Sequence, residues 1–131
     1  MSACRSNIAG PVLIVEDDPD IREILTESLA AFGFEVVTAA HGRDALTLLA
    51  RMPVPPSVIL LDLMMPVMDG WALLDALGHD DALAEIPVVV ISAAKAGLRA
   101  PSQHAFLSKP LDYFKLVDTI DRSLRAPRVA S

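Results

Sequence analysis

The chain has 131 residues, enough for one domain, and 53% of them are hydrophobic. Charged residues or prolines interrupt every apolar run before the roughly 18 residues that a membrane-spanning helix needs, and no secretory signal is recognisable. The net charge of −6 argues against sequence-independent binding to nucleic acid, which needs cations to replace the counterions around phosphates. The single cysteine excludes an internal disulfide framework. We therefore expect a cytoplasmic protein that binds neither nucleic acid nor membrane.

The chain alternates between short apolar runs and segments with helical spacing. Five runs have the length and composition of buried strands. They are residues 11–16, 34–40, 57–62, 86–92 and 104–108. Segments with apolar residues three or four positions apart predict helices. These segments are 18–33, 42–52, 68–78 and 112–125. Alternating strands and helices predict an α/β fold with a parallel sheet, here one domain over residues 10–125 with flexible termini at 1–9 and 126–131.

Polar side chains stand at the carboxyl ends of four predicted strands. Glu16 and Asp17 end the first strand, and Asp62 ends the third. Ser92 ends the fourth strand, and Lys109 follows the fifth. Any one of them alone is an ordinary loop residue or helix cap. Because ligands of open α/β sheets bind beyond these strand ends, the four ends together indicate a functional site.

The chemistry of this set of side chains favours a metal and a phosphoryl group. Clustered carboxylates repel one another unless a cation or a proton intervenes. Oxygen ligands with room for water suit Mg²⁺, which binds through one or two carboxylates and keeps several waters. A carboxylate beside Mg²⁺, a hydroxyl and a lysine can attack a phosphoryl group, and the product is an aspartyl phosphate.

Four motifs resemble those of response-regulator receiver domains, which are CheY-like, and occur in the same order. They are VLIVEDDPDIRE, ILLDLMMPVMDG, VVVISA and FLSKPLD. The resemblance covers residues 11–125 and implies a flavodoxin-like, doubly wound five-stranded parallel sheet in the order 2-1-3-4-5 with about five helices. It also implies a protein of two-component signalling that is phosphorylated by a histidine kinase or a histidine phosphotransfer protein.

The resemblance assigns a phosphorylation role to four positions. Asp62 is the implied phosphoacceptor, Lys109 pairs with the phosphate, and Ser92 is the switch hydroxyl that moves onto it. Phe106 matches an aromatic switch residue, and an ordinary core aromatic is the alternative.

The resemblance also implies the Mg²⁺ ligands. Asp17, Asp62 and the backbone carbonyl of Met64 are the implied direct ligands, and Glu16 acts through a water molecule. Asp18 is better interpreted as the N-cap of the following helix, since Pro19 suits the first helical position.

The connection between the fourth and fifth strands departs from the family pattern. It has 11 residues, 93–103, and includes Gly97 and Pro101, which are poor in a helix interior. We expect a shortened fourth helix of about 6 to 8 residues. We also expect this segment to be flexible or to order on a partner, and the usual dimer face not to be used.

Several functions remain open on the sequence alone. The leading expectation is a stand-alone receiver that signals by contact with a downstream protein that the sequence does not identify, and that catalyses only its own phosphorylation and dephosphorylation. A receiver within a larger regulator or hybrid kinase is the variant. A Mg²⁺-dependent phosphohydrolase would need a second acid where Met64 stands. A flavin mononucleotide binder would need a phosphate loop where the acidic segment EDDPD lies.

Overall fold

The computed structural model describes residues 10–62, 70–92, 105–108 and 112–125, which form five strands and four helices. In chain order the elements are β1 (Val12–Val15), α1 (Pro19–Ala31), β2 (Val36–Ala39), α2 (Gly42–Arg51), β3 (Val58–Asp62), α3 (Gly70–Gly78), β4 (Val88–Ser92), β5 (Ala105–Ser108) and α4 (Tyr113–Arg125). Each lies within a segment predicted for its type. The expected short helix in 93–103 and the expected flexible termini lie outside the described residues. Within them, no helix is both long and apolar enough to cross a membrane.

The five strands form one parallel sheet in the order β2-β1-β3-β4-β5. The predicted α/β architecture is confirmed, and the strand order is the one that the resemblance implied. Val15 of β1 is level with Leu61 of β3, so the next residues, Glu16 and Asp62, lie side by side. The chain leaves β1 toward β2 on one side and returns to β3 on the other. This reversal is the point where open α/β sheets bind ligands.

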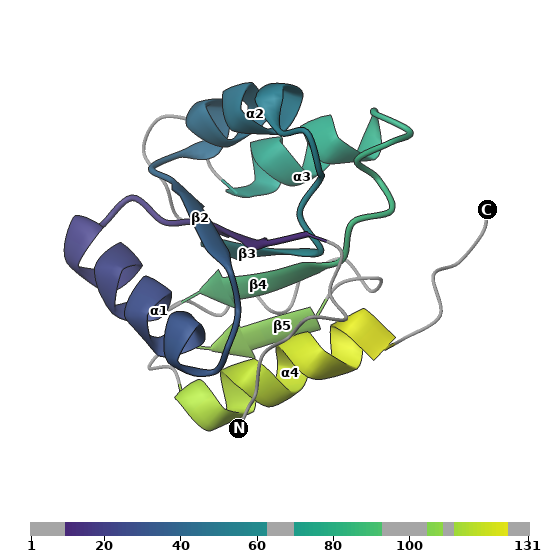
Figure 1. Ribbon diagram of the computed structural model, residues 1–131. Coiled ribbons are helices and arrows are strands. Elements are labelled where there is room, and N and C mark those ends of the chain that lie inside the picture. Colours follow the sequence, from purple (N-terminus) through teal and green to yellow (C-terminus); the bar gives the residue numbers. More distant parts are fainter. Residues whose placement is uncertain (1–9, 63–69, 93–104, 109–111, 126–131) are drawn as a thin grey trace.

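Helices cover both faces of the sheet. Helices α2 and α3 lie over one face, and α1 and α4 lie over the other (Figure 1). Successive strand residues point to opposite faces, so the core has two halves. In the half under α2 and α3, the sheet contributes Leu13, Val15, Ile59 and Leu61, and the two helices contribute Ala45, Leu49, Leu73 and Leu77. This two-sided burial explains why the strands are continuous apolar runs rather than alternating ones.

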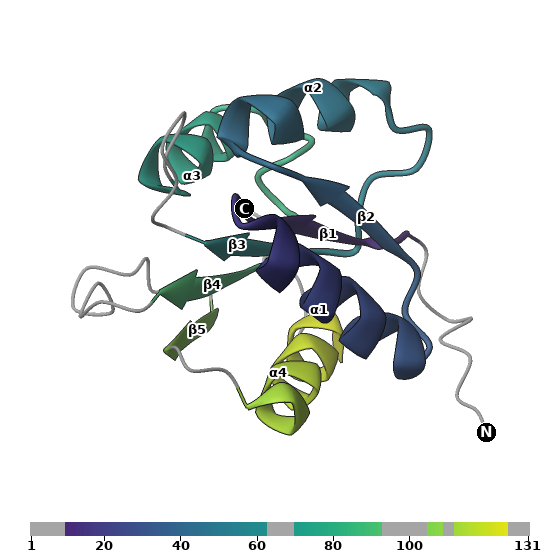
Figure 2. The ribbon, with the colours of Figure 1, turned by 90° about the vertical axis from the view of Figure 1, so that its left-hand side faces the viewer.

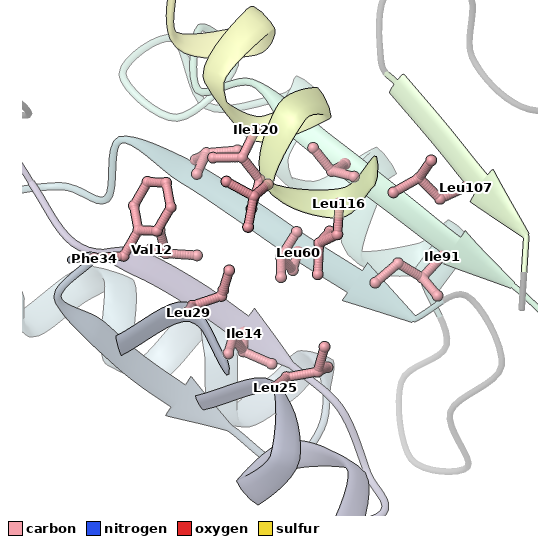
Figure 3. Close-up of a cluster of buried hydrophobic side chains, with 13 residues drawn as sticks. Val12, Ile14, Leu25, Leu29, Phe34, Leu60, Ile91, Leu107, Leu116 and Ile120 are labelled. Atoms are coloured by element: carbon pink, nitrogen blue, oxygen red, sulfur yellow. The ribbon is translucent and has the colours of Figure 1, made fainter. Parts of the chain in front are cut away.

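The other half of the core joins α1 and α4 to the sheet (Figure 3). Leu25 and Leu29 of α1, and Leu116 and Ile120 of α4, are each at most 1% exposed. Burial of such a side chain contributes about 1.5 to 3 kcal/mol. The strands that carry the candidate residues are therefore held rigidly from both sides.

The end of α1 fixes where β2 begins. Gly33 has φ of 93°, a left-handed conformation that glycine adopts without strain. The amide of Gly33 donates to the Ala30 carbonyl, and the amide of Phe34 donates to the Leu29 carbonyl. This pair of hydrogen bonds is a Schellman motif, and the predicted C-terminal glycine of the helix is confirmed.

A second local contact joins the amino ends of β1 and β3. The Ser57 hydroxyl donates to the Gly10 carbonyl at 2.7 Å and accepts from the Gly10 amide at 2.9 Å. A Cβ on Gly10 would lie 2.0 Å from the carbonyl oxygen of Pro55. The backbone at Gly10 lies so close to the Pro55 carbonyl that only glycine fits. This contact and the two Ser57 hydrogen bonds tie together the amino ends of the two strands that carry the candidate acids.

Candidate functional site

Three carboxylates gather at the carboxyl edge of the sheet. Glu16, Asp17 and Asp62 each place a carboxylate oxygen within 4.8 Å of the others. Glu16 and Asp62 are only 2% and 4% exposed, whereas Asp17 is exposed. In Figure 2 the arrowheads of β3, β4 and β5 mark this edge of the sheet. The predicted meeting of the acids at the carboxyl ends of β1 and β3 is thus found in the structure.

The donor set fits a small divalent cation. All three groups offer carboxylate oxygens, the ligand type that Mg²⁺ prefers. Two of them, Glu16 and Asp62, are buried. The exposure of Asp17 leaves one side open to solvent, which suits an ion that keeps several waters. Glu16, Asp17 and Asp62 are therefore the side chains that would hold Mg²⁺ here.

Glu16 is tied at both its backbone and its side chain. Its amide donates to the Ala39 carbonyl of β2 at 3.1 Å. Its carboxylate oxygen Oε2 accepts from the amide of Asp18 at 3.2 Å, and its backbone carbonyl accepts from Nη1 of Arg22 at 2.8 Å. The buried acid thus has a defined orientation at the end of β1.

Asp18 serves the helix rather than the acidic cluster. Its Oδ1 accepts from the amides of Asp20 at 2.9 Å and Ile21 at 3.4 Å, and Pro19 occupies the first turn. The predicted N-cap of α1 is confirmed. A carboxylate here also interacts favourably with the positive end of the helix dipole.

Of the remaining predicted residues, Ser92 stands at the same edge, as the last residue of β4. Asp62 is level with Ile91, so Ser92 stands one position further along β4. Ser108, opposite Ser92, is the last residue of β5, and Lys109 follows it directly. Lys109 and Met64 lie outside the described residues, as do the side chains of Ser92 and Phe106. Their roles stay predictions.

The hydrogen bond from Arg22 to the Glu16 carbonyl was not predicted from the sequence. Arg22 lies in the first turns of α1, four residues after the cap, and its guanidinium reaches back to the acidic segment. The available signal was a cation close to three acids at a helix start. An arginine at such a position is usually solvated, so the sequence alone gave no reason to single it out.

Comparison with known proteins identifies the family. Residues 12–121 match the sequence model of the response regulator receiver domain. The chain belongs to this family. This receiver domain is 38% identical over 120 residues to the transcriptional regulatory protein PrrA of Mycobacterium tuberculosis, an alignment that covers 87% of the chain and 49% of PrrA. It spans between 30% and 49% of the length of the curated transcriptional regulators that it matches.

Solved structures of receiver domains have the same fold. The receiver domain of a signal transduction histidine kinase from Syntrophus aciditrophicus is 30% identical, with a TM-score of 0.80 over 94% of this chain and 98% of that one. The receiver domain of the sensor histidine kinase PA1611 from Pseudomonas aeruginosa is 25% identical, with a TM-score of 0.78 over 90% and 100% of the two chains. That structure holds a magnesium ion coordinated in its active site cleft.

Proposed function

We propose that this receiver domain accepts a phosphoryl group on Asp62 from a phosphohistidine of a histidine kinase or phosphotransfer protein, in a reaction that depends on Mg²⁺. The observation that carries the proposal is the cluster of Glu16, Asp17 and Asp62 at the reversal point of the sheet. The acid at the end of β3 is the one that the family motif marks as the acceptor. The magnesium ion in the related PA1611 receiver domain supports the choice of metal.

The proposed transfer exchanges one bond at phosphorus for another. A carboxylate oxygen of Asp62 forms the new P–O bond while the P–N bond to the partner's imidazole breaks, and the imidazole nitrogen takes a proton from solvent. Bound Mg²⁺ supplies positive charge beside the oxygens of the transferring group. Lys109 supplies a second positive charge, and Ser92 hydrogen-bonds to the product phosphate.

The described residues explain how Asp62 stays in place for this chemistry. It ends a strand that is buried along its whole length, so its backbone cannot shift without disturbing the core. The residue is 4% exposed, and the acids that follow β1 flank it. The acceptor oxygen is thus fixed at the edge of the sheet, which favours reaction with an incoming phosphoryl group by position alone.

We further propose a cytoplasmic signalling module that acts through contacts with a downstream protein and has no external substrate. The alternative of a receiver inside a larger regulator or hybrid kinase is supported by the greater length of the curated relatives. A Mg²⁺-dependent phosphohydrolase is less well supported, because Met64 occupies the position where that class needs a second acid.

Phosphorylation with a small donor tests the proposal. The protein is incubated with Mg²⁺ and acetyl phosphate, and its intact mass is measured. The expected result is one phosphoryl group that is stable in acid and labile to hydroxylamine, and that is absent from Asp62→Asn or when EDTA is present. Asp75→Asn, which changes an exposed acid of α3, is the matched control and should be phosphorylated normally. Full phosphorylation of Asp62→Asn would refute the assignment.

A further inference from the structure

The contact between Arg22 and Glu16 completes the end of β1. In the parallel ladder, the Glu16 amide donates to the Ala39 carbonyl, but β2 ends at Ala39. The Glu16 carbonyl lies beyond the regular pairing, and a backbone acceptor in a partly buried position needs a donor. Nη1 of Arg22 provides that donor at 2.8 Å. The Arg22 side chain of α1 therefore supplies the hydrogen bond to the Glu16 carbonyl that a longer β2 would have supplied.

This hydrogen bond acts directly on the peptide that leads to Asp17. The carbonyl of Glu16 and the amide of Asp17 belong to one planar unit, so a hydrogen bond that holds the oxygen also orients the bond to the Asp17 Cα. On the other side of Asp17, the Asp18 amide donates to the Glu16 carboxylate. Asp17 is thus held between two tethered peptides, although its own side chain is exposed.

We propose that Arg22 is a positioning residue, which holds Glu16 and Asp17 in the arrangement that binds Mg²⁺ together with Asp62. The inference rests on the proposed function, since it concerns the same metal site. Three acids within 4.8 Å repel one another before the metal arrives, and the backbone must resist that repulsion. Arg22 anchors the acidic segment to the first turns of α1, and Leu25 and Leu29 hold that helix in the core.

The sign of the effect separates positioning from simple electrostatics. A cation close to a metal site repels Mg²⁺, so on charge alone removal of Arg22 would tighten Mg²⁺ binding. If Arg22 positions the ligands, its removal weakens binding instead. Loss of a residue that orients metal ligands typically costs 10-fold or more in metal affinity, so we expect the dissociation constant to rise roughly 10-fold.

The experiment measures Mg²⁺ binding by isothermal titration calorimetry to the full chain and three variants. Arg22→Met removes the guanidinium but keeps an unbranched stem, and Arg22→Lys keeps a charge and a donor. Arg43→Ala removes a cation from the first turn of α2, which begins at the same edge of the sheet. We expect weaker binding for Arg22→Met, partial recovery for Arg22→Lys, and equal or slightly tighter binding for Arg43→Ala. Unchanged or tighter binding by Arg22→Met overturns the inference.

Two further measurements distinguish a positioning role from general loss of structure. Acetyl phosphate reactions with Arg22→Met should need roughly 10-fold more Mg²⁺ for half-maximal rate, with little change in rate at saturating Mg²⁺. In metal-free NMR spectra the Asp17 amide resonance should shift, while amides of the α2 and α3 face should not. If Arg22→Met does not fold, Arg22→Lys decides the question. A wild-type affinity for Arg22→Lys would overturn the inference, because a lysine preserves the charge but not the planar donor geometry.

The outcomes for this inference and for the proposed function are separable. If the wild-type protein binds no Mg²⁺ and forms no aspartyl phosphate, the proposed function fails. If the wild-type protein does both and Arg22→Met binds Mg²⁺ equally well, only the positioning role fails.

Discussion

Neutralising Asp62 should stabilise the metal-free protein. Glu16 and Asp62 are both buried, and their carboxylate oxygens lie within 4.8 Å of each other. Two full charges at that separation repel by about 3.5 kcal/mol at an effective dielectric constant of about 20, and the further contacts that both acids make offset part of this repulsion. Asp62→Asn keeps the shape of the side chain but removes this repulsion. Weaker hydrogen bonds to the neutral amide offset part of the gain, so the free energy of unfolding should rise by about 1 to 2 kcal/mol.

The assay is urea denaturation of the wild-type protein, Asp62→Asn and the exposed control Asp75→Asn, each with EDTA and with Mg²⁺. A ligand at about 10 times its dissociation constant stabilises the native state by about 1.4 kcal/mol. The wild-type protein and the control should gain this amount from Mg²⁺, and Asp62→Asn should gain much less. A less stable Asp62→Asn in EDTA would show that the three acids are not in mutual repulsion, and the electrostatic reasoning would be wrong.

Three other predictions concern the surroundings of the site. Gly10→Ala should lower the free energy of unfolding by about 2 kcal/mol or more in urea denaturation, because its Cβ would lie 2.0 Å from the Pro55 carbonyl oxygen; wild-type stability would contradict this. Asp18→Ala should cost about 1 kcal/mol of stability through loss of the N-cap, yet leave the Mg²⁺ affinity in calorimetry nearly unchanged; a large loss of affinity would make Asp18 a ligand. The aspartyl phosphate, followed by intact mass, should persist well beyond a few seconds, because Met64 cannot orient a hydrolytic water; decay within seconds would count against this.

The fold could be predicted because its signals are local. Buried parallel strands are continuous apolar runs, and α1 carries a cap, a first-turn proline and a terminal glycine that each act over a few residues. Some predicted strands are longer than the observed ones, because the pairing with the neighbouring strand stops before the apolar run ends. Phe34, for example, was included in a strand but completes the Schellman motif of α1 instead.

The candidate site was predictable only in part. Glu16, Asp17 and Asp62 were found because parallel strand ends meet at one edge. Arg22 was missed because its role depends on the point where β2 ends, a property of strand pairing that no local pattern encodes.

The first turn of α1 also bears on the flavin alternative. A helix N-terminus after the first strand can bind a phosphate through its free amides. Here Oδ1 of Asp18 already accepts from the amides of Asp20 and Ile21, so this carboxylate occupies the place that an anion would take. A phosphate at this edge would then face the acids without those donors. It needs a cation between itself and the carboxylates, and the cluster around Asp62 has the oxygen ligands to hold one. The same residues that oppose binding of a flavin phosphate therefore favour Mg²⁺-dependent transfer of a phosphoryl group.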